Sequence, residues 1–290
     1  MAEIRSSGTW GSALSADEFA AIRSVGFEPV GQVFGAAVYS AGSSTEYSCP
    51  GTQGSSSDGL PPRPATQVSG QGGPGSFGPL VQTMDLARHT AVGRMITECA
   101  ELGGQGVVGV RLSRESFPLG GPQFTALGTA VRAPGAPDGP PVPFTSQVSG
   151  QDFAKLIMAG WVPAGLVLGV SIGSRHDDRK TARQSRWGSG NTEVAGWTEL
   201  VSQSRQDARR QLEGDVKRLG AEGAVVAAMQ LRVRARDCPA TVGRHDHIVE
   251  ATLMGTAVAR FSQARQHHDG PALAIMSLDP QRRQAARIRI

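Results

Sequence analysis

The stretch Ser15–Val38, SADEFAAIRSVGFEPVGQVFGAAV, returns in altered form as Ser149–Ser171, SGQDFAKLIMAGWVPAGLVLGVS. At one fixed offset the matching pairs are Phe19 and Phe153, Gly26 and Gly160, Phe27 and Trp161, Pro29 and Pro163, Gly31 and Gly165, and Gly35 and Gly169. An ungapped series of this kind is not expected by chance. The sequence therefore predicts an internal repeat.

The later part of each half repeats as well. Leu102–Leu112 reads LGGQGVVGVRL and Leu219–Leu231 reads LGAEGAVVAAMQL, and both halves close on the tetrapeptide GTAV, at Gly128–Val131 and Gly255–Val258. A chain of 290 residues has room for two domains. We predict two divergent copies, at residues 12–133 and 145–261, with a linker at 134–144 and a tail at 262–290.

Each copy predicts the same series of elements. A short helix begins at a capping serine, Ser15 or Ser149, and ends at Gly26 or Gly160. A strand, a longer helix with apolar residues at steps of three and four, and a two-stranded hairpin follow. The expected ranges are 30–39, 85–102, 106–112 and 124–132 in the first copy, and 164–172, 193–219, 224–233 and 247–260 in the second. The predicted fold class is α+β, with two tandem β-α-β-β domains, each a three-stranded antiparallel sheet with one helix.

Two segments differ in composition from the rest of the chain. Residues 43–79 form a Gly/Ser/Pro-rich insertion without apolar periodicity, which predicts disorder. Leu156–Gly173 carries no charged residue, and a run of this length could cross a membrane. Gly160 and Pro163 divide it into a helix end and a strand start, so we expect no membrane span.

Composition limits the classes of function. Hydrophobic residues make up 39% and charged residues 19%, which is typical of a globular protein. The net charge of +4 is modest and falls partly in an arginine-rich tail, so nucleic-acid contact through that tail is only an alternative. Cys49, Cys99 and Cys238 are too few and too widely spaced for a disulfide framework, and no signal peptide is visible. We therefore expect a cytoplasmic protein.

Known catalytic motifs are not found. The sequence has no G-x-S-x-G elbow, no H-E-x-x-H and no P-loop. Gly104–Gly109, GQGVVG, follows a predicted helix and precedes a strand, the reverse of a dinucleotide-binding motif. Asp246, Ile248, Glu250 and Thr252 alternate along the last strand and share a face, which we interpret as solvated, with a pore or an interface as the alternative. A non-enzymatic protein is favoured, and an enzyme with its site between subunits is the rival.

A metal site is predicted near the last hairpin. His245 and His247 form an H-x-H pair whose imidazoles point to one face of a strand, and Cys238 in the preceding turn could be a third ligand. A solvated histidine pair is the alternative. His176, followed by Asp177 and Asp178, is interpreted as part of a solvated loop, and Cys99 as a core residue.

The repeated blocks Leu102–Val110 with Gly128–Val131, and Leu219–Val226 with Gly255–Val258, resemble the YbjQ-type putative heavy-metal-binding family. This resemblance implies a dodecin-like fold and a ring of subunits, commonly five, but it supplies no ligand motif. Runs such as Val107–Val108 and Val225–Ala228 also suit strands buried on both faces. We therefore expect a homo-oligomeric binding or scaffold protein whose cofactor, if any, is a divalent transition metal.

Overall fold

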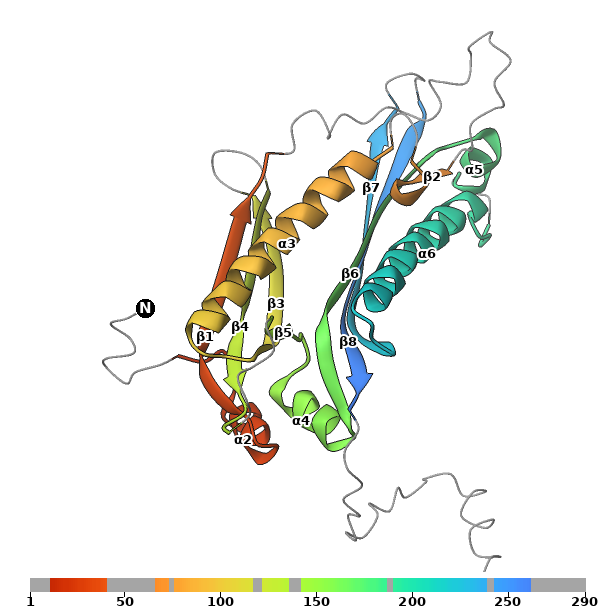
Figure 1. Cartoon of the computed structure of the whole chain (residues 1–290). Helices are drawn as coiled ribbons and strands as arrows, with labels where there is room; N and C mark the ends of the chain where they lie inside the picture. Colours follow the sequence, from red (N-terminus) through yellow and green to blue (C-terminus); the bar gives the residue numbers. More distant parts are fainter. Residues whose placement is uncertain are drawn as a thin grey trace, which may run out of the picture.

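A computed structural model describes residues 11–40, 66–72, 76–116, 122–135, 142–186, 190–238 and 243–261. In these ranges the chain is α+β, with two four-stranded sheets and five α-helices (Figure 1). The predictions made for Cys49, for the tail and for most of the insertion lie outside the described residues. The helices in the described ranges are not long and apolar enough to cross a membrane.

The first sheet, called sheet A, has the strand order β1-β4-β3-β5. Strands β1 and β3 pair antiparallel with β4, and the short β5 pairs parallel with β3. The elements of this half are α2 (Ala16–Ser24), β1 (Glu28–Val38), α3 (Gly78–Glu101), β3 (Gly106–Ser116), β4 (Pro122–Arg132) and β5 (Phe144–Thr145).

The second sheet, called sheet B, has the order β2-β6-β8-β7, with all neighbouring strands antiparallel. Its elements are β2 (Thr66–Val68), with the 3-10 helix η3 (Ser69–Gln71) after it, α4 (Gly150–Met158), β6 (Trp161–His176), α5 (Arg179–Gln184), α6 (Ala195–Arg218), β7 (Gly223–Asp237) and β8 (His245–Arg260).

The predicted three-stranded sheets are corrected to four strands. Each sheet has an additional short edge strand that is distant in sequence from the strand it pairs with. Strand β2 precedes α3 yet pairs with β6, and β5 pairs with β3. Strands of two or three residues give no periodic signal, so the pattern could not predict them. Within the segments predicted as the insertion (43–79) and the linker (134–144), Thr66–Gln71 and Phe144 have regular structure.

The helix caps agree with the sequence. Ser15 and Ser149 are N-caps whose side chains accept hydrogen bonds from the first turns of α2 and α4. Gly26 and Gly160 have φ values of 83° and 80°, the left-handed conformation that glycine adopts most easily. Gly160 also separates α4 from β6, which divides the uncharged run 156–173 as predicted.

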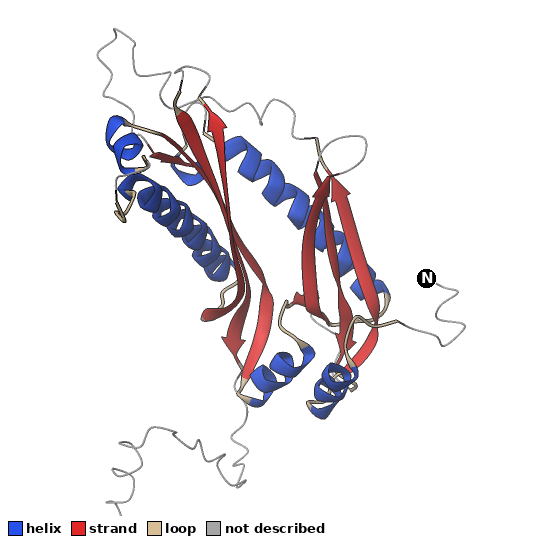
Figure 2. Cartoon of the chain, turned by 180° about the vertical axis from the view of Figure 1, so that it is seen from behind, coloured by secondary structure: helices blue, strands red, loops and turns tan. Residues whose placement is uncertain are grey.

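The two sheets and their helices form layers. Helix α3 covers one face of sheet A, and α6 covers the face of sheet B that points away from sheet A (Figures 1 and 2). The other face of sheet B contributes Val170 and Ile172 to the core around α3 and β3. Sheet B therefore packs against the helix and edge strand of the first half.

The two halves have equivalent strand pairing. The strand order β1-β4-β3 corresponds to β6-β8-β7, and the register is interrupted at Pro29/Gly31 in one sheet and at Pro163/Gly165 in the other. The first glycine of each GTAV tetrapeptide pairs with an equivalent valine, Val33 with Gly128 and Val167 with Gly255.

Strand β7 differs from its expected burial. Val107 and Val108 of β3 are fully buried, as expected, but Val225 and Val226 of β7 are 39% and 47% exposed. The difference arises because segment 144–148 pairs with the outer edge of β3, and Val108 packs against Ile22, Val148 and Phe153. Strand β7 is an edge strand with no element beyond it among the described residues.

Candidate functional site

One end of sheet B gathers a histidine, a cysteine and an aspartate. The ligand atoms of His176, Cys238 and Asp246 all lie within 4.8 Å of one another. His176 is the last residue of β6 and pairs directly with Asp246 of β8. Cys238 follows the end of β7, and its backbone N–H donates to the Arg244 carbonyl at 2.8 Å, which closes the turn between β7 and β8. Three strand ends thus position the cluster.

The cluster lies at the edge of solvent. Asp246 is fully buried and Cys238 is 7% exposed, while the His176 side chain keeps 17% of its surface accessible. His176 Nδ1 and Asp246 Oδ1 are 2.8 Å apart, the distance of a short charge-assisted hydrogen bond. Imidazole, thiolate and carboxylate are the side chains that bind Zn²⁺, and three protein ligands leave a fourth position open.

The structure separates two of the three predicted ligands from this cluster. Cys238 belongs to it. His245 is 55% exposed with its Nδ1 3.1 Å from Asp237, and His247 is next to Trp197, with its Nδ1 3.2 Å from Asp177. The H-x-H spacing places both histidines on one face of β8, and Asp246 between them points to the opposite face.

The sequence interpretation missed His176 and Asp246. His176–Asp178 was interpreted as a solvated loop, but Asp177 is 5% exposed and Asp178 is the N-cap of α5. The face with Asp246 and Glu250 was interpreted as solvated, but it points toward the first half of the chain. His176 and Asp246 come together through the antiparallel pairing of β6 with β8. The register of that pairing cannot be predicted from one sequence alone.

A second feature is a segment that covers the outer edge of β3. Segment 144–148 pairs with it: Ser146 donates its backbone N–H to the Val107 carbonyl at 2.8 Å, and Val110 donates to the Ser146 carbonyl at 2.9 Å. The same segment contacts sheet B, because Ser146 Oγ lies 3.3 Å from Thr256 Oγ1 and Gln147 donates its backbone N–H to that hydroxyl at 3.0 Å. It therefore joins the edge of sheet A to the face of sheet B.

The segment before α2 has an equivalent set of contacts. Ser12 Oγ lies 3.3 Å from Thr129 Oγ1, Ala13 donates its backbone N–H to that hydroxyl, and Leu14 donates to Ser12 Oγ. Val148 likewise donates its backbone N–H to Ser146 Oγ. Thr129 and Thr256 are the threonines of the two GTAV tetrapeptides. Segment 11–14 thus lies on sheet A as 145–148 lies on sheet B, but no strand edge pairs with it within the described residues.

Strand β7 presents the open edge. Within the described ranges the outer backbone edge of residues 223–235 pairs with nothing, and Val226, Met229 and Val233 are 47%, 49% and 60% exposed. A groove of about 920 Å³ runs between this strand and α6, with Leu212, Val216 and Met229 in its lining. Long apolar edges of this kind are sites of strand pairing between chains.

The first half of the chain matches a known protein family. Residues 71–134, from η3 to just beyond β4, match the YbjQ-type family described as "Putative heavy-metal-binding". A "UPF0145 protein" of Clostridium perfringens is 35% identical over 57 residues, which are 20% of this chain and 54% of that protein. This part of the chain is therefore a YbjQ-type domain.

A longer match gives the family of the whole chain. An encapsulin nanocompartment protein of Mycobacterium tuberculosis is 32% identical over 263 residues, which cover 86% of this chain and 85% of that protein. The chain belongs to the family of that encapsulin nanocompartment protein. No solved structure matches the chain.

Proposed function

We propose that this chain is a non-enzymatic, self-assembling component of an encapsulin nanocompartment, built from two copies of one domain. The observation that carries the proposal is that the outer edges of β3 and β7, which are equivalent strands of the two sheets, are covered differently. Segment 144–148 covers β3 within the chain, whereas among the described residues nothing pairs with the outer edge of β7 and no strand edge pairs with segment 11–14. In a head-to-tail ring, segment 11–14 of one subunit would cover β7 of the next.

The exposed side chains support this arrangement. Within the chain, the sheet B face with Leu168 and Ile172 is buried against α3 and β3, at 9% and 5% exposure. The corresponding residues of sheet A, Phe34 and Val38, are 49% and 47% exposed. In a head-to-tail contact they would enter the groove between α6 and β7 of the next subunit. Burial of this apolar surface would favour association by about 25 cal/mol per Å² before the costs of association.

Sedimentation velocity tests the assembly. At micromolar concentration we expect a mass several times 30.3 kDa, and five chains by native mass spectrometry, the number implied by the family resemblance. Met229→Lys should give folded monomers because it puts a charge into the groove. Leu86→Lys is the matched control, since Leu86 is 57% exposed but lies on α3, outside both surfaces. A soluble wild-type monomer would contradict the proposal.

The link to an encapsulin rests on the relative's name and the family relationship. The test is co-expression with an encapsulin shell protein from the same organism. We expect the chain to elute with the shell and to be protected from added protease until the shell is opened. Free elution of the chain at its own mass would remove this part of the proposal and leave the self-assembly test unaffected.

A second function, divalent metal binding, is favoured by the cluster of His176, Cys238 and Asp246. The three ligand types suit Zn²⁺ with one open position. The family description agrees in kind, although its match covers the first half of the chain and the cluster lies in the second.

Calorimetric titration with Zn²⁺ and Ni²⁺ tests the metal site. We expect one ion per chain, loss of binding in His176→Ala and retention in His245→Ala, the exposed control. Binding should weaken on acidification because imidazole and thiol must be deprotonated to bind. The opposite outcome, loss in His245→Ala and His247→Ala only, would restore the ligand set predicted from the sequence.

A further inference from the structure

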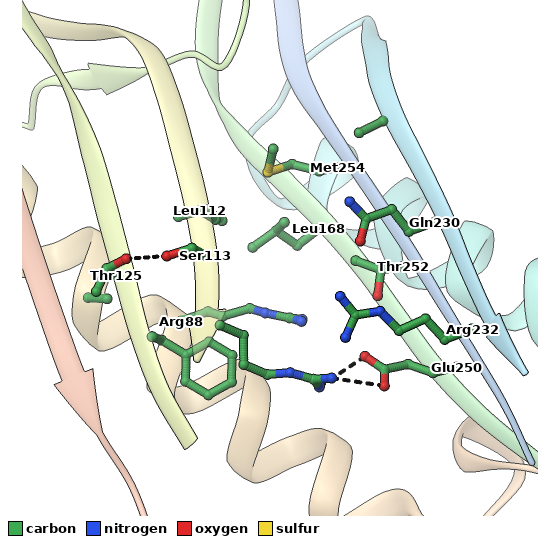
Figure 3. A pocket seen from close by; sticks show the side chains of 14 residues that line it. Arg88, Leu112, Ser113, Thr125, Leu168, Gln230, Arg232, Glu250, Thr252 and Met254 are labelled. Atoms are coloured by element: carbon green, nitrogen blue, oxygen red, sulfur yellow. Dashed lines mark hydrogen bonds and ion pairs between the residues drawn. The ribbon is translucent and has the colours of Figure 1, made fainter. Parts of the chain in front are cut away.

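A cavity of about 300 Å³ lies between the two halves. Helix α3 and strands β3 and β4 form one side, and the inner face of sheet B forms the other. Arg88, Arg232 and Glu250 reach into the same space from α3, β7 and β8 (Figure 3). Leu112, Phe124 and Leu168 line the remainder, together with the hydroxyls of Thr125 and Thr252.

The charges in this cavity are unbalanced. Arg88, Arg114 and Arg232 face one carboxylate, that of Glu250. Arg114 holds this carboxylate with both terminal nitrogens, at 2.9 Å and 3.1 Å. In the described part of the chain, no carboxylate forms a hydrogen bond or ion pair with Arg88 or Arg232. The cavity therefore keeps an excess of positive charge.

Arg88 gives the strongest indication of a missing partner in the cavity. It is only 8% exposed, its guanidinium lies 5.4 Å from the centroid of the Phe124 ring, and its Nη1 is buried without a hydrogen-bond acceptor in the described structure. Burial and the neighbouring Arg114 lower the Arg88 pKa, while Glu250 and Asp85 act in the opposite direction. A buried charge without a partner is costly, so such a group normally has one.

We propose that this cavity binds a small organic anion that carries a phosphate or carboxylate group. Arg88 and Arg232 would bind the oxyanion from two sides, since the planar guanidinium matches the geometry of both groups. The apolar wall of Leu112, Phe124 and Leu168 would contact the rest of the molecule. The volume lies at the lower end of the range for small-ligand sites, which limits the occupant to a small metabolite.

Calorimetry on the assembled protein at 0.15 M NaCl tests the site, with inorganic phosphate and citrate as probes. We expect saturable binding of at least one probe, weakened at least tenfold in both Arg88→Met and Arg232→Gln. Stronger phosphate binding would indicate a phosphate ester as the natural occupant, and stronger citrate binding a carboxylic acid. Arg234→Gln is the control, because Arg234 lies on the same face of β7 but outside the cavity lining. It should bind as the wild type does.

The stability of the unliganded variants separates binding from structure. If Arg88 serves a ligand, Arg88→Met should unfold at the same temperature as the wild type or higher, because it removes an uncompensated buried charge. A lower unfolding temperature together with unchanged phosphate and citrate affinity would make Arg88 a structural residue and overturn the proposal. So would equal weakening in Arg232→Gln and Arg234→Gln, which would indicate a general effect of surface charge.

Discussion

At the scale of single residues, two glycines decide how closely each helix approaches its sheet. Gly35 of β1 faces α3, and Gly169 of β6 faces α6. A methyl group at either position would overlap a backbone carbonyl oxygen, that of Ala91 or that of Ala208. The same residue type is thus required at the matching place in both halves, and the similar blocks 15–38 and 149–171 place both glycines at one offset in the sequence.

Alanine substitution tests that requirement. Gly35→Ala and Gly169→Ala should each destabilise the protein by about 1–3 kcal/mol, the usual cost of overpacking a closed site. Gly93→Ala and Gly214→Ala are the matched controls in α3 and α6, because a new Cβ there meets nothing within 4 Å. They should stabilise their helices by up to about 1 kcal/mol. Urea unfolding curves measure all four, and equal effects at the strand and helix positions would refute the close-packing argument.

At the scale of elements, α2 depends on a capping box that also reaches the second half. The Glu18 carboxylate accepts hydrogen bonds from the backbone N–H of Ser15 at 2.8 Å and of Gly150 at 3.3 Å. The bond from Ser15, more than the bond from Gly150, lowers the pKa of Glu18. One side chain thereby holds α2 and the start of α4 together.

The pH dependence of stability reports this contact. Because the folded state lowers the Glu18 pKa, the stabilisation is complete above the ordinary glutamate pKa and is lost as the pH falls through the folded value. Glu18→Ala should cost about 1 kcal/mol at pH 7, and the difference from wild type should shrink below about pH 4. Asp17→Ala, in the same turn, is the matched control for the loss of a carboxylate from the first turn of α2. Chemical unfolding at several pH values provides the measurement, and a pH-independent difference would contradict the assignment.

Elements with a strong local signal were predicted well from the sequence. The serine caps, the glycines that end α2 and α4, and the apolar stripes of α3 and α6 are all local, and apart from the start of α3 they lie where the sequence predicts them. Helix α3 begins earlier than expected, at Gly78, because Pro79 suits a first turn. Strands β2 and β5, and the meeting of His176 with Asp246, depend on partners distant in sequence and could not be predicted from local pattern.

At the scale of the whole molecule, most of the large exposed apolar side chains belong to two surfaces. One is the outer face of sheet A, with Phe34 and Val38, and the other is β7, with Val225, Val226, Met229, Leu231 and Val233. These surfaces differ in shape, one being a sheet face and the other a groove beside an edge strand. Different, complementary surfaces on one chain produce head-to-tail contacts, which close into rings or continue as filaments.

A mixing experiment distinguishes this arrangement from a symmetric contact. Phe34→Asp damages only the sheet A surface, and Met229→Asp damages only the β7 groove. Both residues are about half exposed in the single chain, so neither variant should unfold, and each alone should be monomeric. Mixed in equal amounts, they retain one intact pair of surfaces, β7 of the first variant and sheet A of the second. Sedimentation should then show a dimer that does not grow further, because its outer surfaces are both damaged.

The double variant Phe34→Asp/Met229→Asp should stay monomeric in any mixture with the single variants, and it controls for nonspecific association. If β7 instead paired with β7 of another subunit, Phe34→Asp alone would remain assembled, and that result would refute the head-to-tail ring.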